Sequence, residues 1–256
     1  MPTTLHDAAV KVPAITLGFW VVKIAATTLG ETAGDAVTMS MDLGYALGTL
    51  IFAAAFVLSV MAQVAARRFH PMLYWFTIIA TTTAGTTLAD LVDRSLGIGY
   101  LGGSTLLLAS VLFTLALWHR VSGTISVDAI ATRRNEAFYW TTIMFSQTLG
   151  TALGDWLADS AGLGFEVAAL VFAAAIAVVA LLYRFTSLSR PILFWAAFIL
   201  TRPLGATVGD FLDKPHAEGG LALSRYAASG TLAIFIVACV LLLPQRAGRH
   251  PQAAAR

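Results

Sequence analysis

The stretch FWVVKIAATTLGETAGD, from Phe19 to Asp35, decides the fold because its pattern returns three more times along the chain. The other copies are YWFTIIATTTAGTTLAD (74–90), YWTTIMFSQTLGTALGD (139–155) and FWAAFILTRPLGATVGD (194–210). The second residue of each copy is a tryptophan, and the spacings are 55, 65 and 55 residues: Trp20, Trp75, Trp140 and Trp195. Repetition at this period indicates a duplicated structural unit.

Three more positions recur without gaps when the copies are aligned on the tryptophan. Ten residues later comes Gly30, Gly85, Gly150 or Gly205; fifteen later Asp35, Asp90, Asp155 or Asp210; and twenty-four later Gly44, Gly99, Gly164 or Gly219. The last glycine falls where the chain is expected to turn back. The sequence is therefore two halves of two repeats each.

Composition indicates the solvent in which these repeats fold. The chain is 58% hydrophobic and 12% charged, with a mean hydropathy of +0.78, whereas a soluble domain carries roughly 25% charged residues. Eight segments reach the ~20 residues that a bilayer requires: 14–34, 44–66, 72–92, 100–119, 137–157, 164–184, 191–212 and 222–243. We expect an all-α membrane protein of eight transmembrane helices, built as four parallel two-helix repeats.

The lysines and arginines at the ends of these segments and between them orient the helices. Eleven fall on one side (Lys11, Arg67, Arg68, Arg120, Arg133, Arg134, Arg184, Arg190, Arg246, Arg249 and Arg256), and three on the other (Arg94, Lys214 and Arg225). The positive-inside rule then places both termini in the cytoplasm and the loops after each repeated aspartate outside.

These spans define the expected domain organisation. Residues 1–120 form the first half, 121–135 a cytoplasmic linker, 136–243 the second half, and 244–256 a flexible cytoplasmic tail. The first apolar run contains Lys23 and no small-residue cleavage pattern, so we expect it to be retained.

Small residues recur four apart on the first helix of each repeat. The pairs are Gly30 and Gly34, Gly85 and Ala89, Gly150 and Gly154, and Gly205 and Gly209. This spacing lets helix backbones approach closely in a membrane. Because all four copies share it, we expect the four odd-numbered helices to pack around the centre, with the even-numbered helices outside. The repeated tryptophans are interpreted as anchors at the membrane interface.

The repeated aspartates are the candidate site. Asp35, Asp90, Asp155 and Asp210 lie near the expected outer helix ends, joined by Glu31 and by Asp93, Asp159 and Asp213. Carboxylate oxygens suit hard cations such as Mn²⁺, Mg²⁺, Ca²⁺ or Na⁺, and the same acids could carry protons. A cation or proton site is one interpretation; the other is that each aspartate caps a short helix or anchors the outer turn.

Two basic residues lie inside predicted spans, where a charge is costly and usually faces a partner or a wet cavity. Lys23 is eight residues before Glu31, and Arg202 is eight before Asp210. They are the candidate charge partners of the acids, either as fixed ion pairs or as replacements for a bound cation. Pro203 follows Arg202 directly and is expected to kink or interrupt its helix.

Polar uncharged residues accompany the acids along the same helices. Thr28, Thr83, Thr148 and Gln147 are candidate lining residues. Threonine hydroxyls also commonly bond back to helix carbonyls, so both interpretations stay open.

Other classes of function have little support. Cys239 is the single cysteine, and the net charge of +2 does not indicate a nucleic-acid partner. The sequence shows no nucleophile pattern, phosphate loop or paired-histidine motif, so we expect no enzyme activity and no cofactor beyond a bound metal cation of unspecified identity.

From Phe19 to about Leu243, the four tandem two-helix repeats with a characteristic tryptophan resemble a bacterial membrane-protein family known as a repeat of unknown function. The resemblance implies a bacterial inner-membrane protein and transfers no activity. Function therefore rests on the residues. The first hypothesis is a transporter or channel for a small hard cation, with the bilayer and that cation as partners. The alternatives are a non-transporting scaffold or sensor whose aspartates cap turns, and a carrier of a small organic solute.

Overall fold

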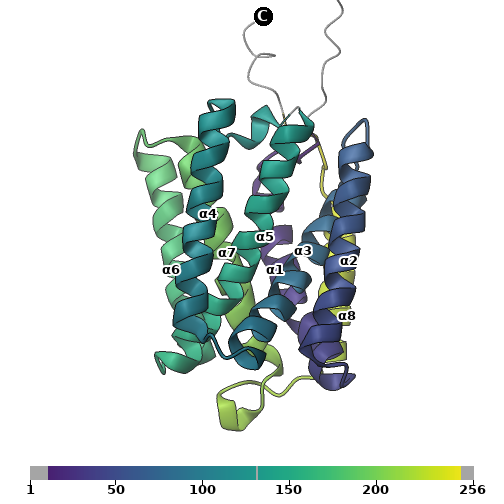
Figure 1. Ribbon diagram of the computed structural model, residues 1–256, viewed down its shortest axis with the longest axis vertical. Helices are drawn as coiled ribbons and strands as arrows, with labels where there is room; N and C mark the ends of the chain where they lie inside the picture. Colours follow the sequence, from purple (N-terminus) through teal and green to yellow (C-terminus); the bar gives the residue numbers. More distant parts are fainter. Residues whose placement is uncertain (1–10, 131, 249–256) are drawn as a thin grey trace, which may run out of the picture.

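The computed structural model describes residues 11–130 and 132–248, and within these ranges the chain forms eight long α-helices and no β-strand. The helices are α1 (Leu17–Asp35), α2 (Gly44–Ala65), α3 (Pro71–Asp90), α4 (Tyr100–Ser122), α5 (Arg133–Asp155), α6 (Gly164–Phe185), α7 (Arg190–Asp213) and α8 (Arg225–Leu242). They run side by side along the long axis of the molecule (Figure 1). The predicted all-α fold of four two-helix repeats is confirmed.

The odd-numbered helices form a closed central ring. Helix α1 contacts α3 and α7, and α5 also contacts α3 and α7. Each even-numbered helix packs outside this ring on the odd helix of the following repeat: α2 on α3, α4 on α5, α6 on α7, and α8 on α1. The prediction that the odd helices occupy the centre is confirmed.

Local sequence sets the helix ends. The hydroxyls of Thr16 and Thr132 cap α1 and α5 by accepting bonds from backbone N–H groups three residues on, and Pro71 begins α3, where a missing N–H costs nothing. The predicted turning glycines all adopt the left-handed φ that other residues avoid: Gly44 at 70°, Gly99 at 78°, Gly164 at 74° and Gly219 at 83°.

The outer connections differ between the fourth repeat and the others. In the first three repeats a five-residue π-helix follows the repeated aspartate directly: η1 (Ala36–Ser40), η2 (Leu91–Ser95) and η4 (Trp156–Ser160). In the fourth, α7 continues to Asp213, and a short 3-10 helix, η5 (His216–Glu218), follows. Lys214 therefore lies directly after a helix end. Helix α7 also runs unbroken through Pro203, so the expected interruption is absent from this described segment.

Aromatic side chains fill the other end of the ring, away from these outer connections; this is the aromatic end. The residue before each tryptophan contacts the tryptophan of the next odd helix, with ring centroids 5.5–6.0 Å apart: Phe19 and Trp75, Tyr74 and Trp140, Tyr139 and Trp195, Phe194 and Trp20. Trp75, Trp140 and Trp195 are only 2–3% exposed. Their interpretation as interface anchors is wrong, because the ring encloses these indoles in its core.

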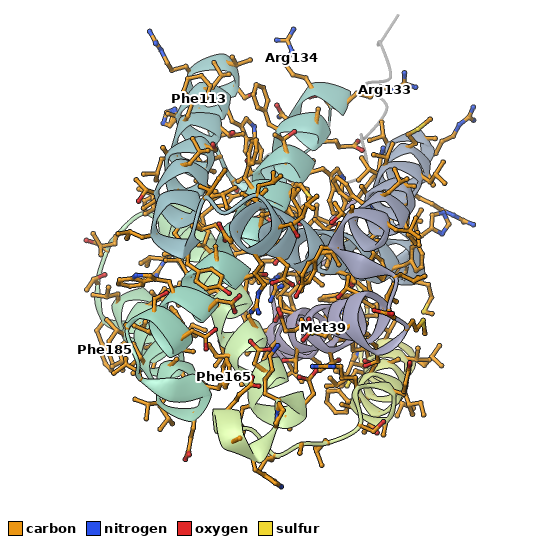
Figure 2. All side chains as sticks on the ribbon, turned by 60° about the horizontal axis from the view of Figure 1, so that its bottom comes forward. Met39, Phe113, Arg133, Arg134, Phe165 and Phe185 are labelled. Carbon is orange, nitrogen blue, oxygen red and sulfur yellow. The ribbon has the colours of Figure 1, made fainter. Side chains whose placement is uncertain are left out.

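Five of the described helices are long and apolar enough to cross a membrane: α2, α4, α6, α7 and α8. Helices α1, α3 and α5 miss this criterion although eight spans were predicted. They belong to the central ring and carry many buried threonines, so they face other helices rather than a surrounding solvent. The outside of the bundle is apolar, with Phe113 and Phe185 projecting at 68% and 72% exposure (Figure 2).

The two ends of the described chain meet at the aromatic end of the ring. The N–H of Ala14 donates to the carbonyl of Arg246, and that of Gly248 to the carbonyl of Val12, both at 2.8 Å. Residues 244–248, the start of the expected flexible tail, are thus bonded to the N-terminal segment. Residues 249–256 lie outside the described part of the chain.

The expected linker, 121–135, also packs on this end. Helix α4 runs on to Ser122, and α5 begins at Arg133. Between them Ile130 is 1% exposed, and the Trp195 indole donates a 2.9 Å bond to the carbonyl of Ile125. The two halves share one ring, because α3 contacts α5 and α1 contacts α7.

Candidate functional site

The ring helices approach most closely at the repeated glycines. A Cβ atom added to the first glycine of each repeat would come within 2.2–2.9 Å of the residue seven after the tryptophan on the next odd helix: Gly30 meets Thr82, Gly85 meets Gln147, Gly150 meets Arg202, and Gly205 meets Thr27. The second set is close as well: Gly34 faces Thr86 at 3.0 Å, Gly154 faces Ala206 at 3.2 Å and Gly209 faces Glu31 at 2.7 Å. Each ring helix thus packs closely against a glycine of the preceding ring helix, and the gap left by the missing Cβ is called a glycine notch.

Arg202 lies inside the ring and links all four of its helices. Its side chain is fully buried. Its Nη2 donates to Glu31 Oε2 on α1 at 2.9 Å, to Thr86 Oγ1 on α3 and to Thr151 Oγ1 on α5. The sequence suggested an acid on the same helix, Asp210, as the partner of Arg202; the ion pair is instead with Glu31.

Lys23 is also fully buried but has no acidic partner among the residues that the structure describes. Its Nζ lies 4.2 Å from the ring centroid of Phe198 and makes no hydrogen bond within the described residues. The pairing of Lys23 with Glu31 that the spacing suggested does not form, because Glu31 is bonded to Arg202.

The four repeated aspartates lie at the other end of the ring as two pairs, each bridged by a base. Arg94 Nε is 2.8 Å from Asp90 Oδ1, and its Nη2 is 3.4 Å from Asp155 Oδ2. Lys214 Nζ is 3.0 Å from Asp35 Oδ2 and 3.2 Å from Asp210 Oδ1. All four aspartates are 1–2% exposed.

A third acid joins the second pair. One oxygen each of Asp35, Asp210 and Asp213 lies within 4.8 Å of the other two, a spacing that could hold a metal ion. Arg225 borders this group, with Nε 3.5 Å from Asp213 Oδ2 and 3.8 Å from Asp35 Oδ2. The structure therefore gathers Asp35 and Asp210 with Asp213 and leaves Asp90 and Asp155 with Arg94.

Sequence reasoning used Arg94, Lys214 and Arg225 only to orient the helices and missed them as partners of the acids. A signal was available: Arg94 follows Asp90 by four residues, and Lys214 follows Asp210 by four, which places each pair on one helical face. The alternative role of helix capping has no support at the first three aspartates. Asp35, Asp90 and Asp155 precede the π-helices without forming a side-chain capping bond.

These contacts form three groups, which together are called the outer charge cluster and contain six acids and four bases: Glu31 with Arg202; Asp90 and Asp155 with Arg94; and Asp35, Asp210 and Asp213 with Lys214 and Arg225. Lys214 lies outside the helices. Burial lowers its pKa, but the carboxylates of Asp210 and Asp35 outweigh burial and hold that pKa above the usual value, so Lys214 is charged. With every acid ionised, the cluster carries two more negative than positive charges.

The candidate lining residues fall into two groups. Thr28, Thr83 and Thr148 each donate to the carbonyl four residues back on their own helix, at 3.1, 2.9 and 3.0 Å. Gln147 is fully buried, and neither atom of its amide has a hydrogen-bond partner in the described part of the chain.

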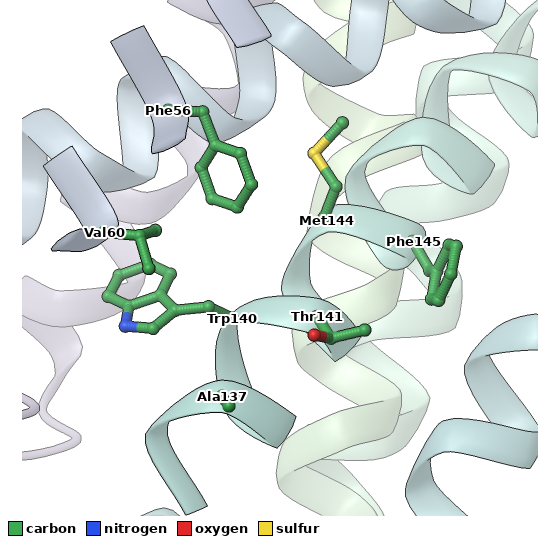
Figure 3. A pocket seen from close by; sticks show the side chains of 7 residues that line it. All are labelled: Phe56, Val60, Ala137, Trp140, Thr141, Met144 and Phe145. Atoms are coloured by element: carbon green, nitrogen blue, oxygen red, sulfur yellow. The ribbon is translucent and has the colours of Figure 1, made fainter. Parts of the chain in front are cut away.

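A separate groove of about 320 Å³ lies between α2 and α5 on the side of the bundle. Figure 3 shows Phe56 and Val60 of α2 facing Trp140 and Met144 of α5 across it. The lining is almost wholly hydrocarbon, which suits lipid chains rather than an ion. The charged residues of the outer cluster do not line this groove.

One carboxylate outside the cluster is buried without a partner. Asp93, in η2, is 7% exposed, and neither oxygen is hydrogen-bonded among the described residues. It packs against Gly103 of α4, where an added Cβ would lie 2.4 Å from Oδ1. Burial raises the pKa of Asp93, and nearby Arg94 offsets this only in part. The equivalent residue of the third repeat is Ala158.

We expect Asp93→Ala to stabilise the protein by about 1–3 kcal/mol at pH 8, because it removes two unsatisfied buried oxygens. The folded pKa of Asp93 is above the unfolded value of about 3.9, so wild-type stability falls as pH rises through the folded pKa. The gain should therefore shrink towards pH 4. Melting temperatures from pH 4 to 8 measure it, with the exposed Asp159→Ala as control. A gain that is equal at every pH would contradict this assignment.

The protein consists of four helix pairs whose repeated spacing builds a central ring with buried charges at one end. The chain belongs to the family described as Repeat of Unknown Function (DUF347), whose model matches residues 18–69, 73–124, 138–188 and 193–245. Each match covers one ring helix and the outer helix that follows it. The resemblance seen in the sequence is thereby confirmed. Comparison with curated proteins and with solved structures gave no match.

Proposed function

We propose that this protein is a bacterial inner-membrane transporter or channel for a small hard cation or for protons, and not an enzyme. The apolar outer surface and the five helices of sufficient length support insertion in a bilayer. Arg133 and Arg134 project from the aromatic end (Figure 2), where the described N- and C-terminal segments also meet. By the positive-inside rule, this end faces the cytoplasm.

The observation that carries the proposal is the charge of the outer cluster. Six acids and four bases share a region in which every acid is at most 6% exposed. Burying an uncompensated charge costs several kcal/mol, so two further positive charges are required when all the acids ionise. Two protons, two monovalent cations or one divalent cation meet that requirement.

Asp35, Asp210 and Asp213 are the proposed ligands. Their oxygens are already grouped within 4.8 Å of one another, and hard cations bind such oxygens at about 2.0–2.6 Å. Lys214 Nζ contacts two of these three carboxylates in the structure. Lys214 lies directly after the end of α7, and a bound cation would compete with its ammonium group for the same oxygens. The lysine and the cation would then occupy the carboxylates in turn.

The experiment is cation flux into proteoliposomes, scanning Mn²⁺, Mg²⁺, Ca²⁺, Na⁺ and K⁺ at two pH values. Asp213→Asn removes one ligand while leaving Asp35 and Asp210 to hold Lys214. We expect saturable flux to fall about tenfold or more, the effect of losing one strong charged contact. Asp159→Asn, an exposed carboxylate at the same end, should transport like wild type. Equal flux in wild type and Asp213→Asn would contradict the site assignment.

The ion pairs also favour a second function, a membrane scaffold or sensor whose acids only join helices. Each repeated aspartate already contacts a base of the same chain. In that case no cation would cross the membrane at either pH, and Asp213→Asn would alter melting alone.

A further inference from the structure

A second group of buried polar atoms lies nearer the middle of the ring. Lys23 Nζ, Thr82 Oγ1, Gln147 Oε1 and Nε2, and Arg202 Nε and Nη1 have no hydrogen-bond partner within the described residues. All four side chains are 0% exposed. Buried polar groups are bonded in more than about 90% of cases, so the five of these atoms that can donate, all except Gln147 Oε1, indicate a common ligand that accepts hydrogen bonds.

The ring geometry brings these side chains together. Thr82, Gln147 and Arg202 stand at the same level, seven residues after their tryptophans, and each packs against a glycine of the preceding ring helix. Lys23 is one turn nearer the aromatic end. Its Nζ lies against Phe198, which is itself one turn before Arg202 on α7.

Of the two basic residues at this level, only Lys23 has no acidic partner among the described residues. Between the tryptophan and the first glycine the four ring helices contain two basic residues, Lys23 and Arg202, and no acid. The nearest acids along these helices, before the tryptophan and after the first glycine, already form ion pairs. Glu31 pairs with Arg202 at 2.9 Å, and Glu136 pairs with Lys11 at 2.7 Å. Lys23 Nζ is therefore left without an acidic partner in the described chain.

We propose that Lys23, Gln147 and Arg202 bind a small monovalent anion in the middle of the ring, of the size of a halide or nitrate. The donors available are the ammonium, the guanidinium Nε–H and Nη1–H groups, and the amide N–H; Thr82 adds a hydroxyl donor. An anion supplies the acceptors and the missing negative charge together. The helices meet through glycine on every side of the ring, which limits the ligand to a few atoms. The site shares Arg202 with the outer charge cluster through Glu31, but it lies nearer the middle of the ring and does not depend on cation transport.

The test titrates purified protein in detergent with potassium bromide or nitrate against potassium gluconate, at constant K⁺ concentration and ionic strength. The wild-type melting temperature should rise with bromide and nitrate, because a ligand that binds only the folded state stabilises it. Lys23→Ile introduces the residue found at this position in repeats two and three, Ile78 and Ile143, and should abolish the rise. Arg184→Gln, at an exposed basic residue, should keep it.

Gln147→Thr provides a second variant if Lys23→Ile does not fold, since Thr27 and Thr82 occupy the equivalent positions. It should weaken the apparent bromide affinity about tenfold. Identical melting of the wild type in all three salts would overturn the proposal. A bromide response in Lys23→Ile equal to that of the wild type would also overturn the proposal. If Lys23→Ile does not fold, the same result in Gln147→Thr would overturn it. Absence of cation flux would leave the proposal intact, because these measurements involve no transport.

Discussion

Replacing Arg202 with glutamine is expected to lower the free energy of unfolding by about 3–5 kcal/mol, because it leaves Glu31 as an uncompensated buried charge. Glu31 is 2% exposed, and Arg202 is its ion-pair partner at 2.9 Å. The hydroxyls of Thr86 and Thr151 lose the same donor. The loss should appear as a lower denaturant midpoint and a lower melting temperature in detergent.

The other repeats provide a matched rescue. The residues equivalent to Arg202 are Thr27, Thr82 and Gln147, and those equivalent to Glu31 are Thr86, Thr151 and Ala206. The double variant Glu31→Thr, Arg202→Gln therefore contains only residues that the ring already accepts at these levels. We expect it to recover most of the stability lost in Arg202→Gln. If the double variant is as unstable as the single one, the burial cost of Glu31 is not the cause.

Adding one methyl group at Gly205 is expected to cost about 1–3 kcal/mol, the usual penalty for overfilling a packed interface. The new Cβ would lie 2.3 Å from Thr27 Oγ1 and 2.8 Å from the Thr27 carbonyl carbon. A backbone atom cannot swing aside as a side chain can, so α7 and α1 must separate. The 3.1 Å bond from Thr27 Oγ1 to the carbonyl of Thr201 would then lengthen or break.

Gly230 provides the control for Gly205→Ala. It lies in α8, and an added Cβ there meets nothing within 4 Å. Gly230→Ala should therefore be neutral or stabilise by roughly 0.5–1 kcal/mol, the intrinsic preference of a helix for alanine. Melting of both variants in the same detergent separates packing from helix propensity. Equal melting of Gly205→Ala and wild type would show that the ring is looser than these contacts require.

The helices, the turning glycines and the central place of the odd helices could be predicted because each follows from a pattern repeated in register. Four copies of small residues spaced by four define which helix face is buried. The prediction that α1, α3 and α5 are apolar enough to span a membrane did not hold. A helix that is enclosed by other helices can carry threonines that a lipid-facing helix would not.

The charge pairings could not be predicted, because they depend on which helices are neighbours and which side chain crosses between them. Arg202 and its partner Glu31 are 171 residues apart in the sequence. Spacing along one helix had instead suggested Asp210 as the partner of Arg202 and Glu31 as the partner of Lys23. Lys214 reaches Asp35 over 179 residues in the same way. The tryptophans were misplaced for a related reason, since their burial depends on the closure of the ring.

The packing of α8 on α1 means that no repeat is structurally first or last. The outer helix of each matched segment packs on the ring helix of the following segment, not on the ring helix of its own. Helix pairs in space are therefore offset by half a repeat from helix pairs in the sequence. The helices therefore follow one another around a closed ring, and backbone bonds between residues 12–14 and 246–248 hold the first and last described segments together. A circular permutant with these ends joined and the chain opened in the segment between α4 and α5 would order the same helices differently in sequence while building the same ring.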